Sequence, residues 1–233
     1  MSAGPASAQV SVRLLPRLDW VGVLLGALLL WAWDRSGWDL TVSRWFGDGG
    51  GFAWRDAWLT NMLLHQGGRA LAWCLVALLL VHVWQPLPLV SKQQTRSQRG
   101  WMLVAVLLCI ALVPMLKQFS VSSCPWDLRE FGGVAAYVSH WDAILQGLRD
   151  GGPGRCFPSG HAVAAFGFLP VYFALRRHER QRARGWWWAI VFLGLLYGTA
   201  QLVRGAHYVS HTLWSAWSCW TLALCLNGWV VRR

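Results

Sequence analysis

Histidines and cationic residues gather in three short segments of the chain. Lys117 precedes a Cys-Pro pair at 124–125, the tetrapeptide Pro-Ser-Gly-His occupies 158–161, and Arg204 precedes a pair of histidines at 207 and 211. Histidine can attack phosphorus or donate a proton, and cations neutralise the charge of a phosphate. These residue types together indicate phosphoryl transfer.

The Pro-Ser-Gly-His segment has the features of an anion site. We expect a helix to begin at Ser159 and Gly160, so that unpaired backbone N–H groups and the positive end of the helix dipole face outward. Gly160 lets an oxyanion approach the backbone closely. His161 then lies on the first turn, within reach of that anion. His207 and His211 are four residues apart at the start of another helix, so they share one face.

The composition indicates the class of protein in which these residues lie. Hydrophobic residues make up 55% of the 233 residues, charged residues only 13%, and there are 19 Trp, whereas soluble domains are roughly 25% charged. This excludes a disordered chain, a coiled coil and a small disulfide-stapled toxin. Spanning helices need about 20 mostly apolar residues, and six runs come close: 20–33, 71–84, 101–116, 157–175, 186–203 and 212–231. We predict an all-α polytopic membrane protein, with residues 1–233 forming one domain, a six-helix transmembrane bundle.

The charge pattern predicts the topology. Segments 85–100 and 176–185 and the two termini carry nearly all of the net charge of +11. Cytoplasmic loops are enriched in Lys and Arg, so we expect both termini in the cytoplasm and the protein in a bacterial inner membrane. The first run has no small-residue cleavage site, which indicates an uncleaved anchor. The basic excess is therefore a topology signal, and no nucleic-acid partner is expected.

Three segments fall on the extracytoplasmic side in this topology: 34–70, 117–157 and 204–211. The first contains a run of three glycines, expected to be a flexible hinge between Trp-rich amphipathic stretches on the membrane surface. The chemical residues all lie at this face, so they can meet there.

At this point the three segments resemble the signature of the type 2 phosphatidic acid phosphatase superfamily. That signature is written Lys-x6-Arg-Pro, then Pro-Ser-Gly-His, then Ser-Arg-x5-His-x3-Asp. The second motif matches fully at 158–161, while Lys117 and Pro125 match the first in spacing. The resemblance implies a six-helix membrane phosphatase without a metal or other cofactor.

The resemblance also implies roles for individual residues. His207 is the nucleophile that becomes phosphohistidine, and His161 protonates the leaving oxygen. Lys117, Ser159 and Gly160 bind the substrate phosphate.

Two arginines of the signature are absent. Cys124 stands where the first motif has Arg, and Gln201 stands where the third motif has its Arg. Arg204 is the first candidate to replace them, and Arg155 and Arg129 are weaker candidates.

The carboxylate of the third motif is also absent, because His211 stands in its place. We expect His211 to orient His207 by accepting a hydrogen bond from it. Asp127 is a candidate substitute carboxylate.

Several of these residues have simpler interpretations. Lys117 can snorkel from a helix end, and Arg204 can be an interfacial anchor. Three histidines outside the motifs, His65, His140 and His178, are expected at interfacial or solvated positions, and His82, within an apolar run, is expected to be a hydrogen-bonded core histidine.

The cysteines divide into two groups. Cys74, Cys109, Cys219 and Cys225 lie within apolar runs and are expected to pack as small apolar residues. Cys124 and Cys156 lie outside the runs or at their edge, on the side predicted to be oxidising. Each adjoins a motif that must converge on one phosphate, so we predict a Cys124–Cys156 disulfide. Two free thiols are the alternative.

Three functions fit these observations. The first is an extracytoplasmic phosphatase or phosphotransferase acting on a lipid phosphate in the bilayer, such as phosphatidic acid, phosphatidylglycerol phosphate, a polyprenyl pyrophosphate or a phosphorylated glycolipid. The second is a non-catalytic lipid-phosphate binder or transporter. The third is a zinc-dependent membrane hydrolase, because histidines at i and i+4 can chelate zinc.

Overall fold

The structure, a computed structural model, describes residues 6–230, with side chains from 17 to 227. The helical elements are α1 (Ala6–Ser36), α2 (Trp38–Ser43), η1 (Leu59–Gly67), α3 (Gly68–Trp84), α4 (Arg96–Gln118), η2 (Pro125–Asp127), η3 (Arg129–Phe131), α5 (His140–Gln146), α6 (Val163–Phe166), α7 (Leu169–Leu175), α8 (Arg180–Val203) and α9 (Val209–Val230). The strands β1 (Gly47–Asp48) and β2 (Gly51–Phe52) form a small antiparallel hairpin. The chain is therefore mostly helical, as the composition predicted.

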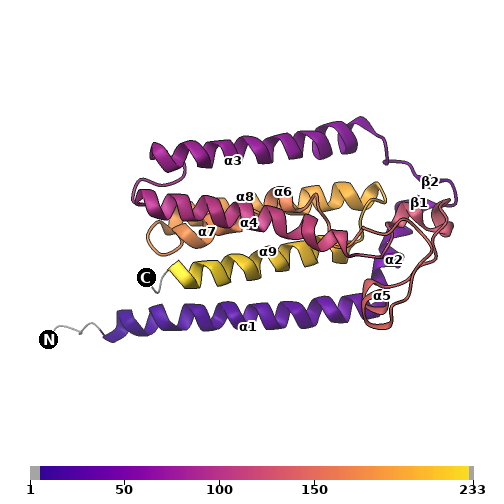
Figure 1. Ribbon diagram of the computed structural model, residues 1–233, viewed down its shortest axis with the longest axis horizontal. Coiled ribbons are helices and arrows are strands. Elements are labelled where there is room, and N and C mark those ends of the chain that lie inside the picture. Colours follow the sequence, from indigo (N-terminus) through magenta and orange to yellow (C-terminus); the bar gives the residue numbers. More distant parts are fainter. Residues whose placement is uncertain (1–5, 231–233) are drawn as a thin grey trace.

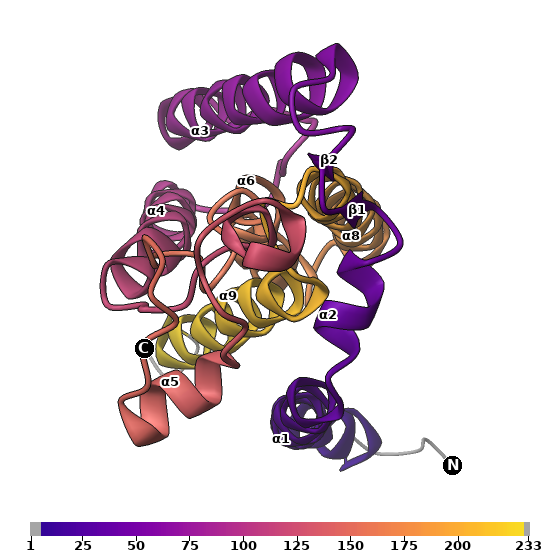
Figure 2. The same ribbon diagram turned by 90° about the vertical axis from the view of Figure 1, so that its right-hand side faces the viewer.

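The long helices run side by side in one bundle (Figure 1). Helix α9 packs against α1, α4, α7 and α8, whereas α3 packs chiefly on α4 and α1 chiefly on α9. Viewed along the bundle, α3 and α1 lie on opposite sides of the other helices (Figure 2). The interior holds one apolar cluster to which Leu79, Val106, Phe168 and Cys219 belong. The bundle thus buries the inward side of its helices around one core.

The outer face of the bundle is apolar. Leu24 and Leu28 of α1 are 64% and 62% exposed, and Trp188 and Phe192 of α8 are 67% and 66% exposed. Soluble proteins rarely expose such contiguous apolar surface. Within the described residues, three helical stretches are long and apolar enough to cross a membrane: Leu59–Trp84, Arg96–Gln118 and Arg180–Val203. These features indicate a membrane protein.

The fourth apolar run does not form the single helix expected over 157–175. It begins with a turn, and its helical part is divided into α6 and α7, so the first helical residue is Val163. Pro170 lies in the first turn of α7, where a missing N–H costs nothing because the first N–H groups of a helix have no partner within it. Pro114, by contrast, lies inside α4, where it removes one hydrogen bond. The Pro-Ser-Gly-His segment therefore precedes a helix by several residues.

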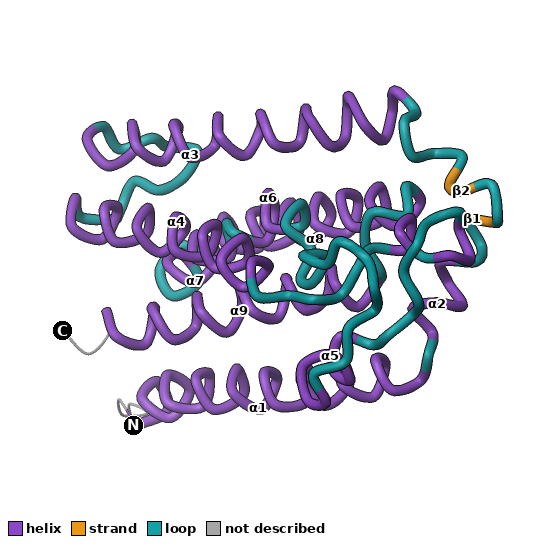
Figure 3. Tube along the Cα trace, turned by 45° about the vertical axis from the view of Figure 1, so that its right-hand side comes forward, coloured by secondary structure: helices purple, strands orange, loops and turns teal. Residues whose placement is uncertain are grey.

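The two ends of the bundle differ. The first described turn of α1, the last of α9 and the loops that join α3 to α4 and α7 to α8 lie at one end, whereas α2, α5 and the hairpin lie at the other (Figure 1). Irregular backbone also gathers at that second end (Figure 3). The basic segments 85–100 and 176–185, which the charge pattern assigned to one side of the membrane, thus lie at the same end of the bundle. The terminal residues 1–5 and 231–233, predicted to be cytoplasmic, lie outside the described part of the chain.

A second, smaller core underlies the irregular end of the bundle. Phe52, Leu128, Phe131, Ala135 and Tyr208 form it. The glycine run expected to be a flexible hinge is instead the turn of the hairpin, and the hairpin contributes Phe52 to this core. This core fixes the loops that carry the first and third motifs.

Candidate active site

The first and second motifs lie beside each other on extended backbone. The N–H of Arg155 donates to the carbonyl oxygen of Ser120 at 2.8 Å, and that of Cys156 donates to Ser122 at 2.9 Å. A disulfide joins Cys124 to Cys156, the pair expected from the sequence. The end of α4 is therefore tied to the Pro-Ser-Gly-His segment at several points.

The third motif docks on the first through the loop between α8 and α9. The N–H of Trp126 donates to the carbonyl oxygen of Gly205 at 2.9 Å. Gly205 has a φ of +71°, and a side chain there would collide with the ring of Phe52. Only glycine satisfies both conditions, so the hairpin and the loop pack closely just before His207.

A buried carboxylate fixes the start of α9. Asp39 of α2 accepts the N–H of Ser210 at 3.0 Å and the indole N–H of Trp33 at 2.9 Å, and it also accepts the Ser210 hydroxyl. Burial raises the pKa of Asp39 above its usual value, although these hydrogen bonds act in the opposite direction. A carboxylate at a helix N-terminus satisfies an unpaired N–H and favours the dipole. Asp39 thereby holds the turn that carries His211.

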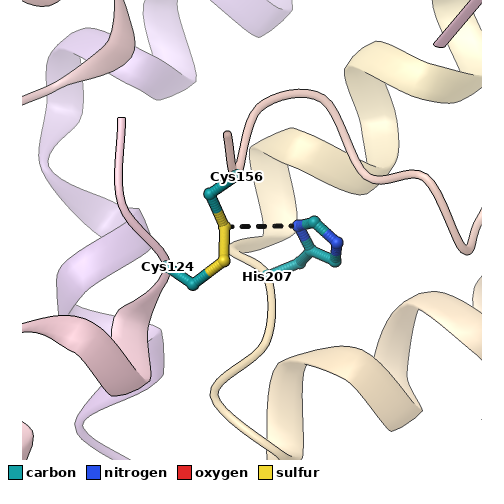
Figure 4. A group of neighbouring side chains, drawn as sticks. All are labelled: Cys124, Cys156 and His207. Carbon is teal, nitrogen blue, oxygen red and sulfur yellow. Dashed lines mark hydrogen bonds between the residues drawn. A yellow bond between two sulfur atoms is a disulfide. The ribbon is translucent and has the colours of Figure 1, made fainter. Parts of the chain in front are cut away.

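His207 and His211 both contact Cys156, and Figure 4 shows the His207 ring beside the Cys124–Cys156 disulfide. Nδ1 of His207 lies 3.5 Å from Sγ of Cys156, and Nδ1 of His211 lies 3.1 Å from the Cys156 carbonyl oxygen. A carbonyl only accepts, so His211 carries a proton on Nδ1. The two ring centroids are 5.7 Å apart, and no hydrogen bond joins the rings in the described structure. The expected hydrogen bond from His207 to His211 is thus not formed, and Nδ1 of His211 donates to the carbonyl of Cys156 instead.

His207 is held in a neutral form. Its pKa lies well below the ordinary value because the ring is buried, and because the charge of Lys117 nearby disfavours a second positive charge; a hydrogen bond to the backbone of Cys156 opposes this. A neutral imidazole has the lone pair that a nucleophile needs. His207 is therefore prepared for attack at neutral pH.

His161 contacts a segment that no motif includes. Its Nε2 lies 3.1 Å from the carbonyl oxygen of Leu64 in η1, so it donates there. The rings of His65 and Tyr197 lie 4.4 Å and 5.1 Å from its ring. A Cβ at Gly68 would lie 2.8 Å from the Tyr197 ring, so glycine lets this stretch approach α8. His65, expected to be interfacial or solvated, is partly exposed and also lies against His161, a contact that no motif indicated.

The backbone around Ser159 and Gly160 differs from the helix N-terminus that was expected there. The N–H of Ser159 donates to the carbonyl oxygen of His211 at 3.0 Å and so is not available to a ligand. Its hydroxyl is buried and has no hydrogen-bond partner in the described structure. A Cβ at Gly160 would meet nothing within 4 Å, so space lies in front of that residue. The N–H groups of Gly160 and His161 have no acceptor within residues 6–230. These two amides, and not that of Ser159, are free for an anion.

Two cations lie among the histidines. Lys117 is half-buried at the end of α4 and makes no ion pair or hydrogen bond with the described residues. Arg204 is 7% exposed and donates to the Arg55 carbonyl at 2.8 Å, to Asn61 Oδ1 at 3.3 Å and to Gln201 Oε1 at 3.5 Å. These acceptors are neutral, so neither cation has a carboxylate partner in the described part of the chain. Such positive charge favours an anionic ligand.

The other residues considered as replacements for the missing motif residues make contacts outside the histidine cluster. Arg155 is exposed, and the Arg129 side chain donates to the Val134 carbonyl at 3.0 Å. Asp127 accepts the N–H of Cys124 at 3.2 Å and so caps η2. Burial raises the pKa of Asp127. The structure thus places Lys117 and Arg204 beside the histidines, and it uses Asp127 to shape the loop.

A buried carboxylate nearby has no counterpart in the sequence motifs. Oδ2 of Asp34 accepts the indole N–H groups of Trp141 and Trp214, each at 2.7 Å, and lies 3.1 Å from Nε2 of His140. His140 is buried, stacks on Phe157 at 4.0 Å and meets the edge of the His211 ring at 5.6 Å. His140 is thus not solvated as expected. The sequence analysis missed Asp34; an acidic residue at the end of an apolar run is costly, and this signal could have identified it.

Metal ligation was one of the sequence hypotheses. Among the described residues, the group with suitable spacing is Cys124, Cys156 and His207. Both sulfurs are joined in the disulfide, and a metal needs thiolate. Zinc binding at this place therefore requires the disulfide to be reduced first.

The role of His211 can be tested by substitution. His211→Asn retains an N–H donor for the Cys156 carbonyl, whereas His211→Asp places a carboxylate oxygen against it, although Asp is the residue of the family signature. A buried acceptor left without a donor costs about 1–3 kcal/mol. We therefore expect the Asp variant to unfold at lower temperature and to be less active than the Asn variant. Thermal unfolding in detergent measures this, and an Asp variant equal to the Asn variant would contradict the assigned hydrogen bond.

The comparisons with known proteins agree with this geometry. A family model described as the PAP2 superfamily matches residues 99–233. No curated protein and no solved structure matches the chain. The matched stretch covers more than half of the chain and includes all three motifs, so the chain belongs to the PAP2 superfamily.

Proposed function

We propose that this protein is a membrane lipid-phosphate phosphatase that works through a phosphohistidine at His207. The PAP2 family consists generally of phosphatases. The observation that carries the proposal is that two cations without a carboxylate partner among the described residues lie in the histidine cluster: Lys117 is close enough to act on the buried neutral His207, and Arg204 is close enough to act on His161 and His65. A phosphate group supplies the charge that these cations lack, and its phosphorus is the target for that histidine.

The proposed reaction has two steps. Nε2 of His207 attacks phosphorus, because Nδ1 faces Cys156. The bond from phosphorus to the leaving oxygen breaks, and the doubly protonated form of His161 gives that oxygen the proton of Nδ1, because its Nε2–H donates to Leu64. Burial lowers the pKa of His161 to about 4, and the negative charge of the bound phosphate favours the protonated form. Water then attacks the phosphohistidine and returns a proton to His161, the P–N bond breaks, and phosphate leaves. Lys117, Arg204 and the amides of Gly160 and His161 stabilise the charge of the transferred group.

The substrate is proposed to be a lipid because the site lies at one end of an apolar bundle. The proposed topology has six spans in one domain over 1–233, with both termini in the cytoplasm of a bacterial cell and the site on the outer side of its inner membrane. The charge grouping of the loops supports this. An oxidising compartment also suits the disulfide beside the site.

The function is tested with purified protein and a panel of lipid phosphates, with and without EDTA. Release of phosphate from at least one lipid, unaffected by EDTA, is the expected result. Loss of release with EDTA and recovery with zinc would favour a zinc hydrolase instead. Tight binding of a lipid phosphate without release would favour a non-catalytic binder.

The pH dependence gives an independent test. The pKa of His207 lies below its ordinary value of about 6.5, so the ring stays neutral until the pH falls well below that value. The acid limb of kcat/KM should lie correspondingly low. Lys117→Met removes a nearby positive charge, which raises the pKa of His207 and should move the limb to higher pH. Profiles of kcat/KM, scaled to their maxima, compare the two proteins, and a limb that does not move would contradict the assigned effect of Lys117.

A further inference from the structure

His65 contacts the second motif although no motif includes it. Its ring centroid lies 4.4 Å from that of His161, and the carbonyl oxygen of its neighbour Leu64 accepts from His161 Nε2 at 3.1 Å. Both residues belong to η1, where the backbone is wound more widely than in an α-helix. Such wide turns are frequent at functional sites. Two consecutive residues of η1 thus contact the proposed acid.

The hydrogen bonds fix which nitrogen of His65 carries the proton. A guanidinium only donates, so the atom of Gln201 that faces Arg204 at 3.5 Å is Oε1. The other atom of the amide, Nε2, then lies 3.3 Å from Nδ1 of His65 and donates to it. Nδ1 is therefore the acceptor, and the proton of the neutral His65 ring is on Nε2.

This Nε2–H group lies among positive charges. It has no acceptor within the described residues, and the ring is partly exposed. Arg204, Arg69 and Lys117 are close enough for their charges to act on His65, and His65 in turn acts on His207. A donor without an acceptor, near several cations and in ring contact with His161, matches an oxygen of a bound phosphate.

We infer that His65 donates its Nε2–H to the phosphate group of the substrate and is a further substrate-binding residue beside His161. This rests on the proposed function, because the anion is the phosphate that His207 attacks. Gln201, which stands where the family signature has Arg, is then a positioning residue: it sets the tautomer of His65 and holds Arg204. Arg204 then takes the cationic role of the missing arginine. Gln201, which occupies the position of that arginine in α8, orients His65.

Two amide substitutions separate binding from support. In His65→Gln, an amide N–H can occupy the place of Nε2 and reach the phosphate. In His65→Asn, an amide oxygen can occupy the place of Nδ1 and accept from Gln201, but no donor reaches as far as Nε2. His65→Ala removes both groups. His178→Ala is the matched control, because His178 is an exposed histidine in the loop after α7, at the other end of the bundle.

Binding of inorganic phosphate and steady-state kinetics on a lipid phosphate are measured for all five proteins. We expect His65→Ala and His65→Asn to weaken phosphate binding and raise KM about tenfold to a hundredfold, the usual effect of losing one hydrogen bond to a charged group. His65→Gln should stay within about threefold of the unmodified protein, and His178→Ala should not differ. Nitrogen NMR of the unmodified protein should show the His65 proton on Nε2, with a shift on addition of phosphate.

The outcomes separate this inference from the proposed function. If the unmodified protein binds phosphate and releases it from lipid, but His65→Ala equals it, the inference on His65 is wrong and the function stands. If Asn restores binding and Gln does not, His65 only supports Gln201, and the inference is again wrong. If the unmodified protein neither binds nor releases phosphate, the proposed function fails as well. Should His65→Ala not fold, as thermal unfolding would show, the comparison of Gln with Asn decides.

Discussion

His207→Ala should abolish phosphate release, with a loss of more than about 10⁴-fold, because it removes the nucleophile itself. The histidine is buried between the disulfide and Lys117, and no other histidine occupies its place in the described structure. His161→Ala should cost roughly 10²–10⁴-fold, the usual contribution of general acid–base catalysis. Both variants should fold, because the contacts that dock the loop come from backbone groups of Gly205 and Ser210.

The leaving group distinguishes the two roles. In an aryl phosphate whose phenol is acidic, the phenolate can leave without receiving a proton. His161→Ala should therefore recover much of its activity on that substrate. His207→Ala should remain inactive on both substrates and should form no acid-labile phosphoprotein. Retention of more than about a tenth of the activity by His207→Ala would exclude the phosphohistidine mechanism, and His178→Ala again serves as the control.

Opening the disulfide should have the second large effect. Cys124 and Cys156 are 32 residues apart, and a bridge that closes such a loop stabilises a fold by about 3–4 kcal/mol on the chain-entropy model. Activity should fall as well, because the carbonyl of Cys156 holds His211 and its sulfur contacts His207. Cys156→Ser, or reduction of the unmodified protein, should therefore lower both the unfolding temperature and kcat/KM.

Cys74→Ser is the matched control, because Cys74 is an exposed free cysteine of α3. It should be as stable as the unmodified protein and equally sensitive to reductant. Mass spectrometry of alkylated, unreduced protein shows directly whether the bridge forms. An unfolding temperature that does not respond to reduction would contradict the predicted stabilisation, even if the bridge is found.

Patterns within the sequence predicted the helices and the convergence of the motifs. Apolar runs indicate membrane spans by their length alone. The spacing between Lys117 and Pro125 matches the family signature and can be recognised without knowing how the loops fold. The pairing of Cys124 with Cys156 followed from their exclusion from those runs. Each of these inferences depends on side-chain type and local spacing, which a single sequence displays.

Other parts of the site had no such signal. The hydrogen bond from His211 to Cys156 ends on a backbone carbonyl. Every residue has a backbone carbonyl, so the amino-acid type at position 156 does not reveal this partner. The contact of His161 with Leu64 spans 97 positions, and the wide turn of η1 leaves no period to detect. The start of α6 at Val163 was missed because sequence patterns place helix ends only to within a few residues.

The family match begins at residue 99, whereas Asp39, Phe52 and Leu64 all precede it and all contact the motif-bearing half. Asp39 holds the start of α9, Phe52 fills the space beside Gly205, and Leu64 holds His161. The three motifs therefore depend for their placement on residues that precede the matched stretch. Substitutions before residue 99 can therefore change the surroundings of His161 or of the loop that precedes His207 without altering a single motif residue. Two proteins with identical motifs and different first halves should accordingly be assumed to differ in substrate until both halves are compared.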